Sequence, residues 1–213
     1  MLGTLKEYHP IHRPLTRGLT CLLVTLALAV GCDDATGPEE TLVYFPLTVG
    51  SEWTYAPPRA EFGNPFEWTV TARSGDTVTV NRPEYGSHPG PVTLLDGGAT
   101  VKISLDGGPF ATLYRFTPGA EWIRRDPWEC DDGSEWVTLT ETEPIETPAG
   151  TFTNTLRLER RSEANCADAG TMVEWWAPGV GLVAWDELNY YAGGPLTWSL
   201  SSYSRPQSLA DRR

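Results

Sequence analysis

The pattern of hydrophobic and polar residues predicts short β-strands along most of the chain beyond its N-terminal segment. Phe66, Trp68 and Val70 alternate with polar residues, and Val78 and Val80 repeat this alternation after a turn made of Ser, Gly and Asp. A period of two places such residues on one face of a strand. We therefore expect a hairpin with one apolar face and one polar face.

Two Asp-Gly-Gly sequences predict the turns of a three-stranded meander. They occur in Leu95-Asp96-Gly97-Gly98 and, ten residues later, in Leu105-Asp106-Gly107-Gly108. Asp-Gly favours tight hairpin turns, because the central residues of these turns need a positive φ. The expected strands are Pro91–Leu95, Ala99–Leu105 and Pro109–Phe116.

The rest of the chain has the same pattern of short alternating runs separated by turn residues. No stretch shows the period of about 3.6 residues that is typical of a long amphipathic helix. The further expected strands are Glu121–Arg125, Trp136–Glu143, Thr151–Arg161, two strands of Thr171–Tyr191 that flank the turn Ala177–Gly181, and a last strand with Leu196, Trp198 and Leu200 on one face. We expect an all-β fold, an antiparallel curved sheet that forms a partial or closed barrel. It would make up a single domain, residues 42–204, followed by a polar tail, residues 205–213.

The N-terminal segment has the pattern of an export signal. Three basic residues precede an apolar run from Gly18 to Cys32, which is too short to span a membrane comfortably. The end of this run, Leu28-Ala29-Val30-Gly31-Cys32, resembles the lipobox of bacterial lipoproteins. The resemblance implies a signal peptide, residues 1–31, and a lipid on Cys32 that anchors the protein to a membrane of the bacterial cell envelope, with the domain on the exported side. An ordinary cleaved signal peptide and an uncleaved N-terminal anchor are the alternatives.

The segment after the lipobox predicts a flexible tether. Residues 33–41 contain no apolar residue larger than alanine, so they cannot bury enough surface to become ordered. Residues 32–41 would therefore link the lipid to the domain.

The chain is strongly acidic, with 16 Lys and Arg against 28 Asp and Glu and a net charge of −12. Beyond residue 31 the balance is 13 against 27, a formal charge of −14. A charge of this sign repels nucleic-acid phosphates and anionic lipid head groups. We expect no nucleic-acid partner. We also expect that the lipid alone attaches the domain to the membrane and that the domain itself does not bind the membrane surface.

The cysteine count predicts one disulfide. Cys21 would leave with the signal peptide and Cys32 would carry the lipid, so Cys130 and Cys166 remain in an oxidising compartment, where they can pair. His88 is the single histidine beyond the signal, and no cysteines are spaced for zinc, so we expect no metal site and no cofactor. The acidic stretch 126–135 does not have the oxygen spacing of a calcium loop and is interpreted as a solvated loop.

Three segments resemble a family of bacterial exported lipoproteins of uncharacterised function. Residues 44–55 match the pattern aromatic-x-Pro-Leu-x-x-Gly-x-x-Trp-x-Tyr. Residues 147–158 are similar to Pro-x-Gly-x-Phe-x-Asn-x-Leu-x-Leu, with Thr155 where family members often have cysteine. Residues 171–191 contain the motif Trp-Ala-Pro-Gly-Val-Gly-Leu-Val. The matches cover most of the expected domain, and the resemblance implies an exported lipoprotein without naming a ligand.

The sequence shows no recognisable catalytic motif. It has no glycine-rich phosphate loop and no Gly-x-Ser-x-Gly, and a nucleophile scheme would depend on His88 alone. We therefore expect no catalytic residues. A carboxylate-dependent hydrolase is the enzymatic alternative, because acidic residues are plentiful.

Tryptophan is abundant, and all nine tryptophans follow residue 32. The candidates for ligand contacts are Trp53, Trp68, Trp175, Trp176, Trp185 and Trp198. Trp175 and Trp176 are adjacent in an expected strand, so they should point to opposite faces. We expect a non-enzymatic module that binds a hydrophobic or extended ligand, or a protein partner, on a concave aromatic face. A carbohydrate-binding β-sandwich with exposed tryptophans is the alternative, and tryptophans that only fill the core are the simplest interpretation.

Overall fold

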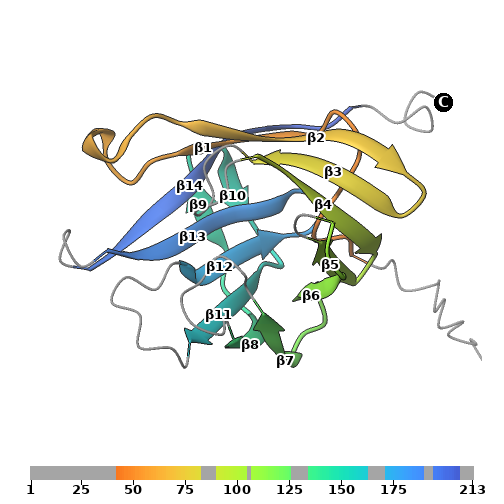
Figure 1. The fold of residues 1–213 in the computed structure, drawn as a ribbon. Helices are drawn as coiled ribbons and strands as arrows, with labels where there is room; N and C mark the ends of the chain where they lie inside the picture. The colour runs from red at the N-terminus through yellow and green to blue at the C-terminus, as the bar shows by residue number, and fades with distance from the viewer. Residues whose placement is uncertain are drawn as a thin grey trace, which may run out of the picture. The chain divides into compact units, whose positions relative to one another are not determined.

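The residues that the structure describes form one large antiparallel sheet of twelve strands, which curves until its two edge strands lie side by side (Figure 1). The computed structural model describes residues 42–82, 90–104, 107–125, 134–162, 171–189 and 194–206. The strands of the sheet are β1 (Glu52–Ala56), β2 (Phe66–Ser74), β3 (Thr77–Arg82), β4 (Gly90–Gly97), β5 (Thr100–Ser104), β6 (Ala111–Arg115), β7 (Glu121–Arg125), β8 (Ser134–Glu141), β11 (Leu156–Ser162), β12 (Thr171–Ala177), β13 (Gly181–Asn189) and β14 (Gly194–Ser204). A separate hairpin consists of β9 (Ile145–Thr147) and β10 (Gly150–Phe152), and a short 3-10 helix, η1 (Ala60–Phe62), lies between β1 and β2.

The order of the strands in the sheet is β6-β5-β4-β3-β2-β1-β14-β13-β12-β11-β8-β7. Most neighbours in the sheet are also neighbours in the chain, but β1 pairs with β14 and so joins the first strand to the last. A short turn connects the edge strands β6 and β7, and in it the Gly119 amide donates to the Leu139 carbonyl at 2.9 Å. The predicted all-β fold is confirmed, and the sheet is a nearly closed barrel. The alternative β-sandwich is wrong, because these strands form one continuous sheet instead of two facing sheets.

The apolar residues of the alternating pattern point into the barrel and form its core. Trp53 lies opposite Trp68, and Val80 lies opposite both Val70 and Val92. All five side chains are buried. The predicted hairpin is therefore confirmed as β2 and β3, and the predicted meander as β4, β5 and β6.

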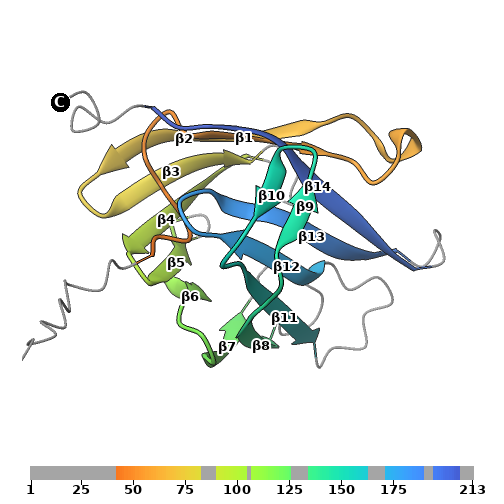
Figure 2. The same ribbon diagram turned by 180° about the vertical axis from the view of Figure 1, so that it is seen from behind.

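The segment before β1 closes one end of the barrel, which we call the plugged end. Tyr44, Phe45 and Leu47 are buried, and the Phe45 ring lies edge-on to the rings of Trp53 and Trp176, with centroids 6.1 and 5.0 Å away. Figure 2 shows this segment and the β9–β10 hairpin crossing in front of the strands. The residues just before β1 are thus part of the core.

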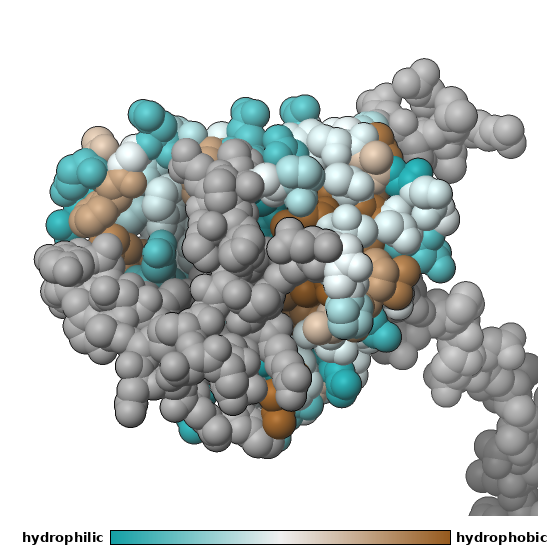
Figure 3. Space-filling model, in the orientation of Figure 1, coloured by the Kyte–Doolittle hydropathy of each residue, from teal (hydrophilic) through white to brown (hydrophobic). Residues whose placement is uncertain are grey.

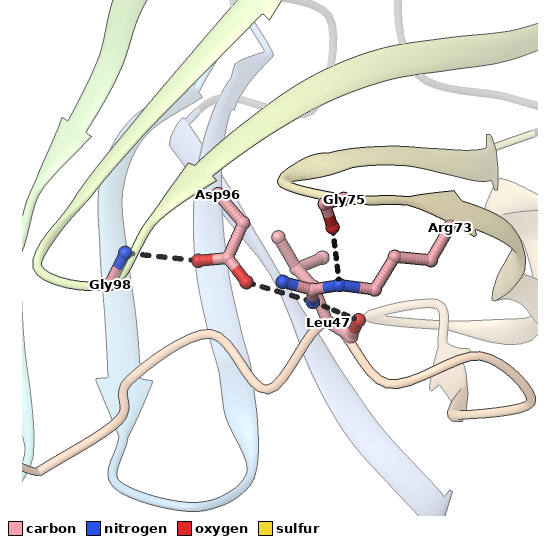
Figure 4. A network of polar contacts seen from close by, with 5 residues as sticks. All are labelled: Leu47, Arg73, Gly75, Asp96 and Gly98. Atoms are coloured by element: carbon pink, nitrogen blue, oxygen red, sulfur yellow. Dashed lines mark hydrogen bonds and ion pairs between the residues drawn. The ribbon is translucent and has the colours of Figure 1, made fainter.

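Arg73 connects the segment before β1, which we call the plug, to two hairpin turns (Figure 4). Its Nη1 donates to the Leu47 carbonyl at 3.2 Å and to Oδ2 of Asp96 at 2.9 Å. Its Nε donates to the Gly75 carbonyl at 2.9 Å, and the Gly98 amide donates to Oδ1 of Asp96 at 3.0 Å. One guanidinium group therefore holds the plug, the β2–β3 turn and the β4–β5 turn together.

Four strands end at the opposite end of the barrel, because they run in the same direction through the antiparallel sheet: β3, β7, β11 and β13. Arg82 is the last residue of β3, and Arg124 and Arg160 lie within the last three residues of β7 and β11. The three arginines are only 5%, 1% and 7% exposed. We call this end of the barrel the arginine end.

The predicted strand Thr151–Arg161 is wrong as a single element. It divides into β10 and β11, because Asn154 between them has a positive φ of 54° and breaks the extended backbone. The first part pairs with β9 instead of the main sheet, and the Ala149 amide at the tip of this hairpin donates to the Leu200 carbonyl of β14 at 3.0 Å. Sequence analysis did not predict the β9–β10 hairpin.

Several predicted features lie outside the described residues. They are the signal peptide, Cys32 and the tether, Cys130, Cys166, His88 and most of the polar tail. The described part of the chain contains no helix of the length and apolar character needed to cross a membrane.

Candidate functional site

Three tryptophan rings form a row inside the barrel. Trp68 of β2 and Trp185 of β13 are stacked with their centroids 6.3 Å apart. Trp185 and Trp198 of β14 are stacked at 5.7 Å and are almost parallel, with an angle of 7° between their planes. Trp68 and Trp185 are each 2% exposed, whereas Trp198 is only half-buried. The tryptophan row therefore leads from the core to the surface at Trp198.

Two neighbours fix the orientation of the Trp198 ring. Its Nε1 donates to Oε2 of Glu187 at 3.1 Å, and the ring of Phe66 lies 5.2 Å away. Phe66 also contacts Trp185 at 5.5 Å. Because the polar edge of the Trp198 indole already has a partner, the accessible part of the ring is suited to apolar or stacking contacts.

Arg82 lies at the buried end of the tryptophan row. Its Cζ is 4.5 Å from the centroid of the Trp68 ring, which is within the range of a cation–π interaction. A guanidinium group stays charged at any physiological pH. The row therefore has a permanent positive charge at one end and a solvent-accessible ring at the other.

A second buried polar cluster surrounds Glu174 of β12. Arg160 forms an ion pair with Oε1 of Glu174, and both side chains are 2% exposed. The Trp176 indole donates to Oε2 of Glu174 at 2.9 Å, and the Tyr114 hydroxyl is 3.4 Å from Oε1. Burying a carboxylate costs much free energy unless it is paired with a cation and hydrogen-bonded. Glu174 has both kinds of contact.

Tyr55 lies within electrostatic reach of both Arg82 and Glu174. Burial raises the pKa of Tyr55 well above its usual value, and the Arg82 charge acts in the opposite direction. Tyr114 and Glu174 raise the same pKa further. The Tyr55 hydroxyl donates to the Leu182 carbonyl at 3.0 Å, so the neutral form also has a partner. The aromatic core and the charged groups thus form one connected interior.

Four of the six candidate tryptophans lie inside the barrel and are almost fully buried: Trp53, Trp68, Trp176 and Trp185. Trp198 is the interior candidate that reaches solvent. Trp175 points outward, half-buried, with the Arg157 guanidinium 6.0 Å from its ring centroid. The expectation that Trp175 and Trp176 point to opposite faces is confirmed.

The buried charges were missed by sequence analysis, although a signal was present. Arg82 follows Val78 and Val80 at the same two-residue spacing, and Arg160 follows Leu156 and Leu158 in the same way. A charged residue that continues the apolar alternation of a strand is a candidate for a buried position. Applied to each strand, this criterion would have included the arginine end among its candidates, together with Arg115, which is exposed.

The described residues include neither histidine nor cysteine. Among them, no group of three or more acidic side chains is close enough to hold a metal ion. What this part of the molecule offers a ligand is apolar area, aromatic faces and buried charge.

Figure 3 shows the face of the molecule seen in Figure 1. Hydrophobic residues, in brown, are visible in the middle of this face between paler residues and the grey atoms. Apolar residues are therefore visible at the surface on part of this face.

Comparison with models of protein families finds no match, and comparison with curated protein sequences finds none either. Two solved structures are similar. One is a Bacteroides fragilis protein that is proposed to be exported and has a YmcC-like fold, with 14% identity, a TM-score of 0.46, and coverage of 77% of this chain and 100% of that one. The other is a proposed lipoprotein of Parabacteroides distasonis, with 15% identity, a TM-score of 0.45, and coverage of 78% and 100%. Because both TM-scores are below 0.5, neither similarity assigns a function or a fold family to this chain.

Proposed function

We propose that the chain is a lipoprotein of the bacterial cell envelope, anchored to a membrane by a lipid on Cys32. The basic residues, the apolar run and the lipobox-like residues before Cys32 support the anchor. Residues 33–41, which cannot bury apolar surface, suit a tether between the lipid and the barrel.

Metabolic labelling with a fatty acid tests the anchor. The wild-type protein should take up the label and fractionate with membranes, and a Cys32→Ser variant should do neither. Cys21→Ser is the matched control, because that residue would leave with the signal peptide. Label retained on the Cys32→Ser variant would contradict the anchor.

The barrel of this lipoprotein acts as a binding module without catalysis, and it takes an apolar ligand at the outer end of the tryptophan row. The observation that carries this proposal is the stack of Trp68, Trp185 and Trp198, in which the outermost ring is half-buried and has its polar edge bonded. Apolar surface that a ligand buries against these rings contributes about 25 cal/mol per Å². A small apolar ligand can therefore bind there.

Tryptophan fluorescence can test this binding, because a bromine atom quenches an indole that it touches. The full lipidated protein, held in phosphatidylcholine nanodiscs, is titrated with a straight-chain alcohol that carries bromine at the far end of its chain. We expect saturable quenching, and Trp198→Ala should weaken the affinity by at least about tenfold, which corresponds to about 1.4 kcal/mol.

The matched control is Trp175→Ala, which removes a half-buried tryptophan from the outer face of the barrel. This variant should bind like the wild type. Quenching that never saturates, or that is equally affected by both variants, would overturn the binding function.

A further inference from the structure

We propose that the ligand is an amphiphile whose head group is a primary ammonium, and that the Glu187 carboxylate binds this head group. The inference rests on the proposed binding function and adds the chemical class of the ligand. Its basis is the position of Glu187 beside Trp198, the ring at which the tryptophan row reaches solvent.

Glu187 points to the same side of the sheet as the tryptophan row. It lies in β13 two residues after Trp185, and the pairing of β13 with β14 continues through it without a register shift. Its partner in this pairing is Leu196, which is buried. Residues two apart in a strand share a face. The carboxylate therefore lies next to Trp198 on the inner face, in a half-buried position near the arginine end.

The Glu187 carboxylate has one hydrogen bond and no cation. Its Oε2 accepts the Trp198 indole hydrogen at 3.1 Å, whereas Oε1 has no hydrogen-bond partner, and Glu187 has no ion pair, within the described part of the chain. Glu174, the buried carboxylate of β12, differs because Arg160 supplies its cation. A carboxylate that is partly removed from water is stabilised by a cation that pairs with it. Glu187 is thus suited to a cationic group of a ligand.

The Trp198 ring offers an ammonium group a second contact. A cation near the face of an indole is attracted to the ring, and proteins use aromatic side chains in this way to recognise ammonium ligands. Glu187 holds the nitrogen edge of the ring, and the Phe66 ring lies 5.2 Å away. The carboxylate and the accessible part of the indole therefore suit an ammonium head group, and the apolar surface of the rings suits an alkyl chain.

The charges of the molecule also favour a cationic ligand. The net charge of the chain is −12, so the field of the protein attracts cations. Arg82 lies at the other end of the row, and the rings of Trp68 and Trp185 separate it from Trp198. The charged group that contacts the accessible ring directly is a carboxylate.

Binding of matched probes tests the inference. The full lipidated protein in phosphatidylcholine nanodiscs is titrated at about pH 7, where an alkylamine is protonated, with a bromine-tipped straight-chain amine and with the alcohol of the same length. The quaternary ammonium of phosphatidylcholine has no hydrogen to donate to Glu187. We expect the amine to bind at least about tenfold more tightly than the alcohol. Added salt should reduce this preference, because the head-group contact is electrostatic.

Variants assign the preference to the carboxylate. Glu187→Gln removes the charge and keeps an oxygen that can accept the Trp198 bond, so it should reduce the affinity for the amine to about that for the alcohol. Asp186→Asn is the matched control, because it removes the same charge from the next residue, which accepts a bond from Thr197 at 2.6 Å on the outer face. This control should keep the preference. All proteins are compared in the same nanodiscs, so partition of the probes into the bilayer cancels.

The outcomes separate the two proposals. If the amine and the alcohol bind equally, the binding function stands and the ammonium class is wrong. A preference that persists in Glu187→Gln would overturn the role of the carboxylate, and if this variant does not fold, the ratio of amine to alcohol binding in the wild type still decides the ligand class. If neither probe binds saturably, the binding function itself fails.

Competition experiments identify the source of the ammonium group. Stronger competition by vesicles that contain phosphatidylethanolamine than by vesicles of phosphatidylcholine alone would support a lipid head group. Equal competition by the two kinds of vesicle would support a soluble alkylamine. Ammonium chloride that competes as strongly as the bromine-tipped amine would overturn the amphiphile, because the tail would then contribute nothing.

Discussion

The indole Nε1 of Trp53 donates a hydrogen bond of 2.6 Å to the carbonyl oxygen of Val180, which lies 127 residues further along the chain. Tyr203 completes this junction, because its ring stacks on Trp53 at 5.8 Å and its hydroxyl donates to the Gly179 carbonyl at 2.9 Å. Trp53 belongs to the first segment of the lipoprotein resemblance, and Val180 belongs to the last. The two motifs therefore form one structural joint at the plugged end.

Replacing Trp53 by Phe should destabilise the barrel. The change removes the hydrogen bond to Val180 and leaves a smaller ring in a buried position, at a cost of about 2–3 kcal/mol. The midpoint of thermal unfolding, followed by circular dichroism, should fall by about 4–10 °C. Trp175→Phe, on the outer face, should change it little, and an equal fall in both variants would contradict a specific role for the joint.

Gly181→Ala tests the close approach at the same joint. Gly181 has a φ of +111°, and a β-carbon there would lie 3.1 Å from Nε1 of Trp53. Gly63 has a similar φ of +119° with open space around the β-carbon position, so Gly63→Ala carries backbone strain alone. We expect Gly181→Ala to lower the free energy of unfolding by at least about 1 kcal/mol more than Gly63→Ala in urea titrations. Equal losses would show that the contact with Trp53 is unimportant.

The sequence predicted much of the sheet, because the apolar residues alternate clearly in the strands concerned. Phe66, Trp68 and Val70 fill the core as expected, and the Ala177–Gly181 turn lies between two paired strands. The break at Asn154 was not predicted, since Phe152 and Leu156 keep the same two-residue phase on either side of it and the positive φ is seen only in the structure.

The candidate site was harder to predict than the fold. Tryptophan count pointed to the aromatic interior, but sequence alone could not show that Trp68 joins the stack of Trp185 and Trp198, because β2 lies far from β13 and β14 in the chain. Pairing of β1 with β14 brings them together. The charge of the whole chain was misleading for the interior, since a composition averages over the surface and the few buried groups.

The Arg160–Glu174 ion pair predicts a strongly non-additive pair of variants. Arg160→Met leaves the Glu174 carboxylate buried without its cation, and Glu174→Met leaves the guanidinium without this carboxylate, so each should cost about 3–5 kcal/mol. The double variant removes both charges and should recover most of that loss. Urea unfolding of the four proteins measures the coupling. Losses that simply add would show that the two side chains do not act as a pair.

Stability should fall at alkaline pH because of buried tyrosines. Burial raises the pKa of Tyr55 well above the usual value of 10.0, and burial also raises the pKa values of Tyr44 and Tyr203. A raised folded-state pKa gives stability that is complete below the unfolded-state pKa of about 10 and is lost as the pH rises above it, because the unfolded chain then releases protons first.

Thermal melts between about pH 8 and pH 11 check this dependence. The unfolding temperature of the wild type should decrease above about pH 10, and Tyr55→Phe should show a smaller decrease, although it starts from a lower value because it loses the bond to Leu182. An identical slope in both proteins would rule out Tyr55 as the source.

We predict a disulfide between Cys130 and Cys166, because both the cysteine count and the order of the strands favour it. Cys130 lies in the connection that follows β7, and Cys166 lies in the connection that follows β11. Only β8 separates these two strands in the sheet, and both run toward the arginine end, so their last residues are about 10 Å apart. Both connections therefore start close together, in a protein that we propose to be exported to an oxidising compartment.

Closing this loop should stabilise the fold by roughly 4 kcal/mol on the chain-entropy model. Thiol counting on denatured, unreduced protein purified from the envelope checks the bond, and a Cys130→Ser/Cys166→Ser variant should melt at the same temperature as the reduced wild type. Two free thiols in the unreduced protein would show that the cysteines do not pair.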